Sequence, residues 1–573
     1  MKNFSLENTI SVIPNNIFIY IILVFLFHIG YNWGFSEPIV VPDETIYLGH
    51  AYYFFSGHSF SYVNAAFGSF GFPLFITPIL LFFSNPFLVY KAALILNSLL
   101  CVLLFWLIYL FIKDLFNIAK EKAMAIAFVT SLYPAIFTQA SLVITETISF
   151  VLFVLLILLF WKILERKELK YFIFFGLNLG FLYTVHVRSL AFIAAAFLVL
   201  IILAILRVIE LKKVIWSIII CLALFFVTRQ INSHLLLLGW QDLVPYSLSY
   251  TFSKLLTWRG LEIFFYNLLG QFLYLGISSF GLFFVAIFYL VNYLYTSIKS
   301  KGKSILADNK ALVLIFLFLL SGAMFFSSSL FMVFSERLDA VIYGRHNEIF
   351  FILFLAIGIV AFYKNKVSRK NIIFSLFSLL VLGFIISINR GDYSQDTILM
   401  FNTSGVFPLA IILQGLKLFI ISLISIALFT LLIFYFKKSF YNGLVAIVII
   451  FVLMNSINHS YMKAMRVALS NFNDLAYIID EKGIKNLSYD MTNYVCDAKV
   501  SVALRGMHDY PRNFDRWQFL LLGTRFDPFS SQKNEKPINE FVVSSVCWPQ
   551  AEELAAKQIA VDQKNGQALW TVE

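Results

Sequence analysis

Charged residues are scarce in this sequence: Asp, Glu, Lys and Arg together make up only 13% of its 573 residues. Soluble domains carry about a quarter charged residues, because their surfaces must interact with water. Hydrophobic residues instead reach 60% and aromatic residues 18%. A water-soluble fold cannot bury so much apolar surface. The composition therefore excludes such a fold and predicts an α-helical polytopic membrane protein.

Cysteine is also rare, with four residues in the whole chain. Cys101 and Cys221 lie inside apolar runs, whereas Cys496 and Cys547 lie in the polar C-terminal part. The second pair fits a disulfide in an oxidising compartment, and it equally fits two unpaired thiols. The sequence leaves both possibilities open.

A basic domain or basic face is missing as well, although the net charge is +11. Lys and Arg fall in short clusters between apolar runs, which is typical of cytoplasmic loops, so we expect no nucleic-acid partner. A small-residue cleavage pattern is absent after the apolar run at residues 17–31, which continues to Trp33. This run is therefore expected to be the first membrane span and not a removable signal.

Long apolar runs recur along the chain, and the segments between them alternate in charge. One set is short and basic: residues 113–122, 162–170, 207–213, 299–310, 364–370 and 437–438. The alternate set is poorer in Lys: residues 37–72, 133–141, 186–189, 231–270, 335–345 and 389–414. Because basic loops stay in the cytoplasm, the alternation predicts about thirteen spans in a plasma membrane, a cytoplasmic N-terminus and an extracytoplasmic C-terminus.

The composition changes at Asn458, where balanced charge and turn residues replace the apolar runs. We expect a transmembrane domain over residues 1–457 and a small extracytoplasmic α/β domain over residues 458–573. The second domain is expected to contain a helix at residues 462–482 and short strands at 486–489, 540–544 and 568–572. The run at residues 73–83 is too short to cross a membrane and is expected to be a re-entrant or interfacial helix.

Acidic residues near the expected outer boundary are few, and ionisable groups are costly there, so they carry a functional signal. Asp43 and Glu44 follow Pro42 just after the first span, and Glu146 lies between two threonines near the outer end of another span. Such carboxylates can act as a general base or bind a cation. The alternatives are a cap on an interfacial helix for the first pair and a helix-packing hydrogen bond for Glu146.

Basic residues at expected outer helix ends form a second signal. They are Lys91, His186, Arg188, Arg259, Arg337, Arg345 and His346. Guanidinium groups suit phosphate, because their donors match its oxygens in pairs. Each of these side chains also fits a simple extension toward lipid headgroups. Glu348 offers another alternative, as an ion-pair partner of Arg345.

In their order along the chain, these residues resemble the C-type (GT-C) membrane glycosyltransferases, which include protein O-mannosyltransferases and lipid A aminoarabinose transferases. The resemblance rests on Pro42-Asp43-Glu44 followed by Tyr47, on residues 71–78 leading to Lys91 and Asn97, on Glu146 between threonines, and on Arg188 in a tight turn. It is clearest in the first third of the chain. The expected span count and the terminal outer domain agree with it over the remainder.

The resemblance implies transfer of a sugar from a polyprenyl-phosphate donor to a hydroxyl of a lipid, glycan or protein acceptor, at the outer face of a bacterial inner membrane. It implies Asp43 as the catalytic base and Glu44 as a second carboxylate. Tyr47, Glu146 and the basic residues Lys91, His186, Arg188, Arg259, Arg345 and His346 are implied as substrate contacts. A divalent cation, Mg²⁺ or Mn²⁺, held by Asp43 and Glu146 is a further expectation.

Two other functions stay open: a flippase or transporter for a lipid-linked glycan, and a glycan polymerase or ligase. A transporter of this kind is expected to show paired halves and helices broken at the membrane midplane. The sequence shows no internal repeat, and its charges lie at the outer boundary. A polymerase or ligase would share the outer arginines but would not need the Asp43-Glu44 pair.

Overall fold

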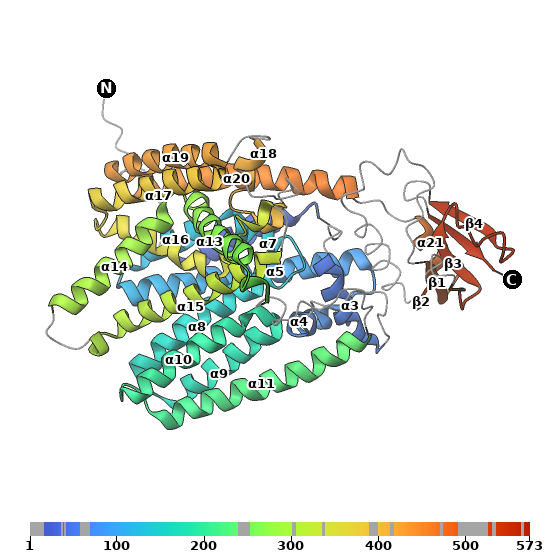
Figure 1. Cartoon of the computed structure of the whole chain (residues 1–573), viewed down its shortest axis with the longest axis horizontal. Helices are drawn as coiled ribbons and strands as arrows, with labels where there is room; N and C mark the ends of the chain where they lie inside the picture. Colours follow the sequence, from blue (N-terminus) through green and yellow to red (C-terminus); the bar gives the residue numbers. More distant parts are fainter. Residues whose placement is uncertain are drawn as a thin grey trace.

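The computed structural model describes residues 16–35, 38, 42–57, 69–238, 253–300, 305–334, 338–388, 399–412, 418–469, 474–490, 525–529, 535–562 and 567–572. Figure 1 shows a bundle of long helices, with a small sheet domain beyond one end of it. Two short helices, α3 (Pro42–Ser56) and α4 (Gly71–Leu80), lie at the end of the bundle that faces the sheet domain. The 10-residue helix α4 agrees with the expectation of a short helix at residues 73–83, and its re-entrant or interfacial placement stays a prediction.

The bundle is built from apolar helices. In chain order they are α2 (Ile17–Asn32), α5 (Pro86–Leu110), α6 (Lys120–Ser131), α7 (Pro134–Ala140), α8 (Glu146–Arg166), α9 (Leu169–Val185), α10 (Leu190–Ile205), α11 (Leu211–Leu238), α13 (Trp258–Ser278), α14 (Leu282–Ser300), α15 (Asn309–Phe331), α16 (Glu348–Tyr363), α17 (Arg369–Ile388), α18 (Phe407–Ile412), α19 (Leu418–Lys438) and α20 (Phe440–Leu469). The expected polytopic helical fold is confirmed.

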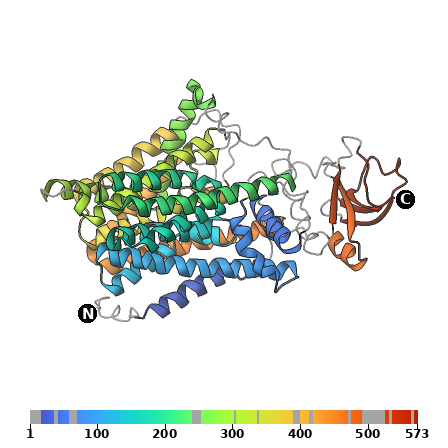
Figure 2. The ribbon, with the colours of Figure 1, turned by 90° about the horizontal axis from the view of Figure 1, so that it is seen from below.

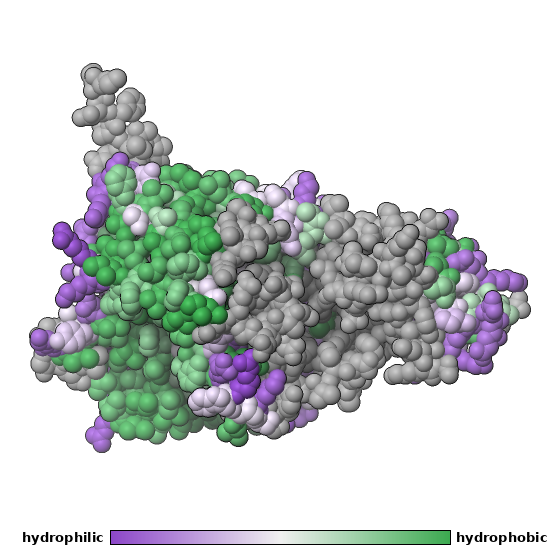
Figure 3. Space-filling view, turned by 45° about the horizontal axis from the view of Figure 1, so that its top comes forward, coloured by the Kyte–Doolittle hydropathy of each residue, from purple (hydrophilic) through white to green (hydrophobic). Residues whose placement is uncertain are grey.

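Among the described residues, ten helices are long and apolar enough to cross a membrane, or up to eleven if the bent pair α6–α7 forms one span. The expected count of about thirteen is therefore not confirmed. The bundle carries large exposed apolar side chains, such as Phe226 on α11 and Phe377 on α17. Figure 3 shows this apolar surface over the helices, with hydrophilic residues at the end opposite the sheet domain. This distribution suits a chain that is solvated by lipid.

Local sequence signals define several helix boundaries. Asn85 caps α5 by accepting from the N–H groups of Phe87 and Leu88, and Pro86 fills the first helical position, where no amide donor is needed. Pro134 starts α7 after a bend of 60° from α6. At the end of the bundle that faces the sheet domain, α11 reaches α3, where the Tyr53 hydroxyl and His234 Nε2 lie 3.1 Å apart (Figures 1 and 2).

A non-helical segment, residues 141–145, joins α7 to α8 and is fully buried. We call it the α7–α8 connector. Backbone groups cannot be left unpaired in an apolar interior, so side chains from other helices must satisfy them. Asn97 Nδ2 donates to the carbonyls of Ala140 at 3.3 Å and Leu142 at 2.7 Å. Because Glu146 begins α8 directly after this connector, these bonds also help to place Glu146.

The C-terminal domain is a five-stranded sheet with one helix packed on it. Helix α21 (Asp474–Glu481) precedes β1 (Asn486–Asp490), β2 (Arg525–Phe529), β3 (Phe541–Ser545), β4 (Lys557–Asp562) and β5 (Gln567–Thr571), in the spatial order β2-β1-β3-β5-β4. The strands β2, β1 and β3 are parallel, whereas β3, β5 and β4 are antiparallel. The expected α/β domain is thus confirmed, together with three predicted strands.

Some details of this region were not predicted. The strands β2 and β4 were missed, and α20 runs through the expected domain boundary at Asn458 to end at Leu469. Asn458 is fully buried and donates to the Thr138 hydroxyl at 3.1 Å. Cys547 is disulfide-bonded and Cys101 and Cys221 are free, while Cys496 lies outside the described residues.

Close helix packing gives a first testable prediction. A Cβ atom on Gly358 of α16 would lie 2.5 Å from the backbone carbonyl oxygen of Leu282 on α14, so Gly358→Ala must push these helices apart. We expect it to lower the unfolding free energy by about 1–3 kcal/mol, measured by denaturant titration in detergent. Gly322→Ala on α15 is the matched control, because nothing lies within 4 Å of its Cβ position. Equal stability of the two variants would contradict the tight α14–α16 contact.

Candidate active site at the ends of α3 and α8

A buried ion-pair cluster joins Asp43, Glu146, Arg188 and Arg345. The Glu146 Oε1 atom accepts from Arg188 Nη2 at 2.8 Å and from Arg345 Nε at 2.7 Å. The Nη2 atom of Arg345 also donates to Asp43 Oδ2 at 2.6 Å. Two positive and two negative charges therefore meet in one place, and each charge has an opposite partner, as burial requires.

The four members of this ion-pair cluster come from distant parts of the chain. Asp43 is the second residue of α3, and Glu146 is the first residue of α8. Arg188 lies in the short 3₁₀ helix η3 (Val187–Ser189) after α9, and Arg345 lies just before α16. The fold brings together four of the residues that the sequence singled out separately.

The backbone at Arg345 is fixed by hydrogen bonds to Asn402. The N–H groups of Gly344 and Arg345 donate to the carbonyl of Asn402 at 2.7 and 3.1 Å, and Asn402 Nδ2 donates to Asp339 Oδ2 at 2.7 Å. Only glycine fits at position 344, because a Cβ there would lie 2.0 Å from the Tyr274 ring. These contacts fix the backbone from which the Arg345 side chain extends to the carboxylates of Asp43 and Glu146.

Two histidines next to the arginines are neutral. His186 accepts a hydrogen bond on Nδ1 from the Arg188 N–H at 3.2 Å, which shapes the tight turn that presents Arg188. Burial lowers the pKa of His186 well below its ordinary value, and the Arg188 charge lowers it further. The pKa of His346 is lowered by burial and then by Arg188 in the same way, and its ring packs edge-on against Tyr343. Both rings therefore add no positive charge at neutral pH.

The exposure of the cluster is uneven. The Asp43 side chain is 28% exposed, whereas Glu146 is completely buried and the arginines are about one-tenth exposed. Asp43 is thus the carboxylate that a substrate can reach. The Arg188 Nε atom is buried and has no hydrogen-bond partner within the described structure. An unsatisfied buried donor is costly, and it is available to an anionic ligand.

Glu44, the neighbour of Asp43, belongs to a different set of contacts. It is fully buried, and its Oε1 atom accepts from the Tyr90 hydroxyl and from the N–H of Val143, both at 2.8 Å. Glu348 does not pair with Arg345 as one alternative proposed. It accepts instead from the hydroxyl of Tyr274 in the interior.

The remaining predicted contacts are placed differently. Tyr47 is buried with its ring edge-on to Phe72, and its pKa is raised by burial and then by the Asp43 and Glu146 charges, so it stays a hydroxyl. Arg259 forms an exposed ion pair with Glu262 at 2.8 Å and does not join the ion-pair cluster. Lys91 is exposed on α5 and makes no hydrogen bond or ion pair with the described residues. Arg337 lies outside the described residues.

The expected divalent cation fits these residues poorly. Asp43 and Glu146 were its expected ligands, but the Arg345 guanidinium already bridges them and Arg188 binds the same Glu146 oxygen. A divalent cation placed between the carboxylates would have to displace Arg345 and face Arg188. No group of three or more His, Cys, Asp or Glu residues that could hold a metal occurs among the described residues.

Sequence reasoning missed one buried cation near the site. Arg466 on α20 is only 6% exposed and donates through Nη2 to the Tyr90 hydroxyl at 3.1 Å and the Ser141 carbonyl at 2.8 Å. The expected boundary at Asn458 places Arg466 in the extracytoplasmic α/β domain instead. A signal was present, because Asn458, Met462 and Arg466 are spaced by four residues and share one helix face, of which the first two are completely buried.

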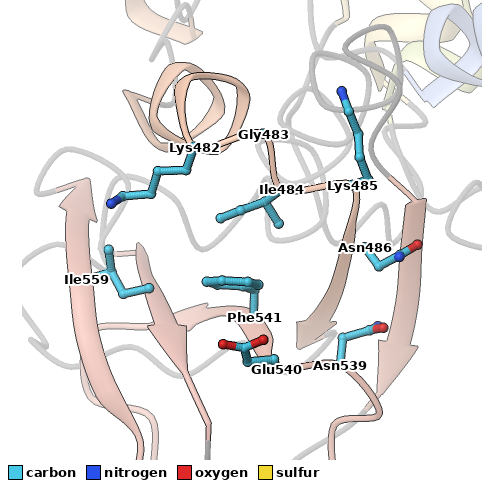
Figure 4. Close-up of a pocket in the computed structure, with 9 residues that line it drawn as sticks. All are labelled: Lys482, Gly483, Ile484, Lys485, Asn486, Asn539, Glu540, Phe541 and Ile559. Atoms are coloured by element: carbon cyan, nitrogen blue, oxygen red, sulfur yellow. The ribbon is translucent and has the colours of Figure 1, made fainter.

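A separate groove of about 600 Å³ lies on the C-terminal domain, between the end of α21 and the starts of β1 and β3. Figure 4 shows Phe541 and Ile484 near its centre, Asn486 and Asn539 together on one side, and Lys485 extending away from the other side chains. All of its lining residues belong to the sheet domain. It therefore contributes nothing to the ion-pair cluster.

No protein-family model and no curated protein sequence matches this chain. Solved structures do. ArnT from Cupriavidus metallidurans in the apo state is 12% identical, with a TM-score of 0.51 over 97% of this chain and 96% of that one. ArnT from the same organism bound to undecaprenyl phosphate is 12% identical, with a TM-score of 0.52 over 99% and 98% of the two chains. The chain thus shares the fold of these ArnT structures, which agrees with the resemblance to the C-type membrane glycosyltransferases.

The cluster predicts a specific loss of stability. Glu146→Gln removes the charge that both guanidinium groups share, which leaves Arg188 uncompensated in a buried place. We expect the unfolding free energy to fall by about 3–5 kcal/mol, measured by denaturant titration in detergent. The matched control is Glu262→Gln, which breaks an exposed Glu–Arg pair and should leave stability unchanged. If both variants were as stable as the wild type, the ion-pair cluster would not be the structural centre of the site.

Proposed function

We propose that this protein is a glycosyltransferase that moves a sugar from a polyprenyl-phosphate donor to an acceptor hydroxyl at the outer face of the membrane. The observation that carries the proposal is the ion-pair cluster, in which two arginines and a partly exposed carboxylate meet at one end of the bundle. A lipid-linked donor arrives through the bilayer and a polar acceptor arrives from water. A site at this boundary can receive both.

Asp43 is the general base in this proposal. It is the only carboxylate of the ion-pair cluster with appreciable exposure, and Arg345 fixes its position through Oδ2. Its other oxygen is not used in that bond and can accept the acceptor proton. Glu146 is fully buried and holds both arginines, so its role is to position them. Glu44, expected as a second catalytic carboxylate, is assigned here to positioning because Tyr90 and Val143 bind it.

Arg188 and Arg345 are proposed to bind the donor phosphate. Guanidinium–phosphate hydrogen bonds are charge-assisted, and the unpartnered Arg188 Nε atom supplies a donor that no described group uses. In the transfer step the acceptor oxygen loses its proton to Asp43 and forms a bond to the anomeric carbon. The bond from that carbon to the phosphate oxygen breaks, and polyprenyl phosphate leaves with the electron pair. The arginines stabilise the charge that develops on it.

Single displacement of this kind inverts the configuration at the anomeric carbon. The related fold of a protein bound to undecaprenyl phosphate, itself a polyprenyl phosphate, supports the choice of lipid. A bacterial inner membrane with a cytoplasmic N-terminus is part of the proposal. It is supported by basic residues in the last turns of helices at the bundle end opposite the site, such as Lys299 of α14 and Lys437 of α19.

The expected Mg²⁺ or Mn²⁺ enters the proposal only as a point to test. Arg345 occupies the position between the two carboxylates that such an ion would bridge. The guanidinium supplies the positive charge there, so we expect turnover to survive chelation of divalent cations.

The test measures polyprenyl phosphate released from polyprenyl-phosphate sugars by the purified protein in detergent, with cell-envelope extract as the source of acceptor. Asp43→Asn removes the base but keeps the side-chain size, so we expect turnover to fall by about 100-fold or more while donor binding is retained. Glu262→Gln, which alters an exposed ion pair away from the site, is the control. EDTA added to the wild-type reaction should leave the rate unchanged.

Each outcome of this experiment decides one point. Wild-type turnover that Asp43→Asn does not reduce would remove Asp43 from the mechanism. Loss of turnover in EDTA would show that the reaction requires a divalent cation. A wild-type protein that binds lipid-linked glycans but consumes no donor would overturn the transferase proposal in favour of a flippase or a ligase.

A further inference from the structure

A second buried polar chain lies beside the ion-pair cluster and takes no part in the chemistry described above. It runs from Arg466 on α20 to Tyr90 on α5 and then to Glu44 on α3. Arg466 Nη2 donates to the Tyr90 hydroxyl at 3.1 Å, and this hydroxyl donates to Glu44 Oε1 at 2.8 Å. We call these three residues the Arg466 chain.

The Arg466 chain is rigidly placed. The Arg466 guanidinium lies over the ring of Phe35 at 4.3 Å and over the ring of Tyr90 at 5.4 Å from the ring centres. Tyr90 and Glu44 are completely buried. Burying a charged pair is costly, and apolar side chains of similar volume usually stabilise a fold at least as well. The buried charges of Arg466 and Glu44 are therefore better explained by a role in positioning other groups than by a contribution to stability.

That geometric role follows from what Glu44 joins. The same Oε1 atom that accepts from Tyr90 also accepts from the Val143 N–H at 2.8 Å. Glu44 is the neighbour of Asp43 on α3, and Val143 lies in the α7–α8 connector, three residues before Glu146. One carboxylate oxygen therefore ties the segment that carries Asp43 to the segment that carries Glu146.

Arg466 makes a second contact with the α7–α8 connector. Its Nη2 atom also donates to the carbonyl of Ser141 at 2.8 Å, in the same α7–α8 connector. The Arg466 chain thus contacts both segments, α3 through Glu44 and the connector through Ser141 and Val143. Because Arg466 lies near the end of α20, it also fixes that helix end, from which the chain continues to the sheet domain.

We infer that Arg466 is a positioning residue for sugar transfer: through Tyr90 and Glu44 it sets the spacing between Asp43 and the Glu146-bound arginines. The inference rests on the proposed function. A base that is displaced from the acceptor hydroxyl loses turnover steeply, and a misplacement of about 1 Å can cost about 100-fold in rate. Donor binding depends on the arginines themselves, which the Arg466 chain does not touch.

Tyr90→Phe is the sharpest test, because it keeps the ring under the guanidinium and removes only the hydroxyl that joins Arg466 to Glu44. With the release assay, we expect kcat to fall by about 10- to 100-fold. KM for the donor should stay within about twofold of the wild type, since the lost interaction acts on the chemical step. Arg466→Lys, which cannot make the same two hydrogen bonds with the same stacking, should reduce kcat in the same direction.

The matched control is Tyr266→Phe. The Tyr266 hydroxyl donates to the Ile386 carbonyl at 2.6 Å, between α13 and α17, so the variant loses a comparable hydrogen bond outside the site. It should lower the unfolding temperature without changing kcat per folded molecule. A merely structural role for Tyr90 predicts the same behaviour in Tyr90→Phe.

A double variant completes the test. If Tyr90 acts through Glu44, then adding Tyr90→Phe to Glu44→Gln should reduce kcat no further, whereas independent effects would multiply. Wild-type kcat in a folded Tyr90→Phe protein, or multiplying effects in the double variant, would overturn the inference while leaving the transferase intact. Absence of turnover in the wild type would overturn the proposed function, and the inference with it.

Discussion

One carboxylate oxygen organises the outer end of this bundle. Glu146 Oε1 accepts from both Arg188 and Arg345, and Arg345 then reaches Asp43. Without this shared acceptor the two guanidinium groups would repel each other, and Arg188 would have no compensating charge, since Arg345 alone also pairs with Asp43. The four side chains meet where the ends of α3, α8, α9 and α16 come together. The position of every group in the proposed reaction depends on Glu146.

Glu146 is itself placed by an irregular backbone. The bend at Pro134 and the connector after it expose carbonyl and amide groups within an apolar bundle, and such groups must find partners. Asn97, Glu44 and Arg466 supply them. The polar side chains around the connector therefore satisfy a local need of the backbone and also determine where α8 begins. The same contacts therefore pair the backbone groups of the connector and position the proposed site.

The sequence predicted the membrane class, the helical fold, the short helix α4 and three of the five strands, because apolar run length and alternation are local properties. It also singled out Asp43, Glu146, Arg188 and Arg345 as individual residues. It could not predict that Arg345 joins Asp43 to Glu146, because Arg345 lies 302 positions from Asp43 and 199 positions from Glu146 in the sequence. The same limit explains why Glu44 was expected to be catalytic. Its neighbour in sequence faces the ion-pair cluster, whereas Glu44 turns to Tyr90 and Val143.

Arg466 shows where composition misleads. The charged residues after Asn458 indicated a water-exposed domain, yet α20 continues to Leu469 and carries Arg466 into the interior. The strands β2 and β4 were missed for another reason. Their pairing with β1 or β5 is defined by tertiary contacts and not by a pattern in their own sequences.

The central claim is that Glu146 gathers arginines to bind a lipid phosphate. The most direct measurement is the equilibrium affinity of the purified protein for undecaprenyl phosphate and for undecaprenol, which has the same chain without the phosphate. We expect the phosphate form to bind at least about tenfold more tightly, because each charge-assisted hydrogen bond contributes about 1.5–3 kcal/mol. Arg188→Gln should remove most of that difference. Equal affinity of the wild-type protein for the two lipids would contradict the account.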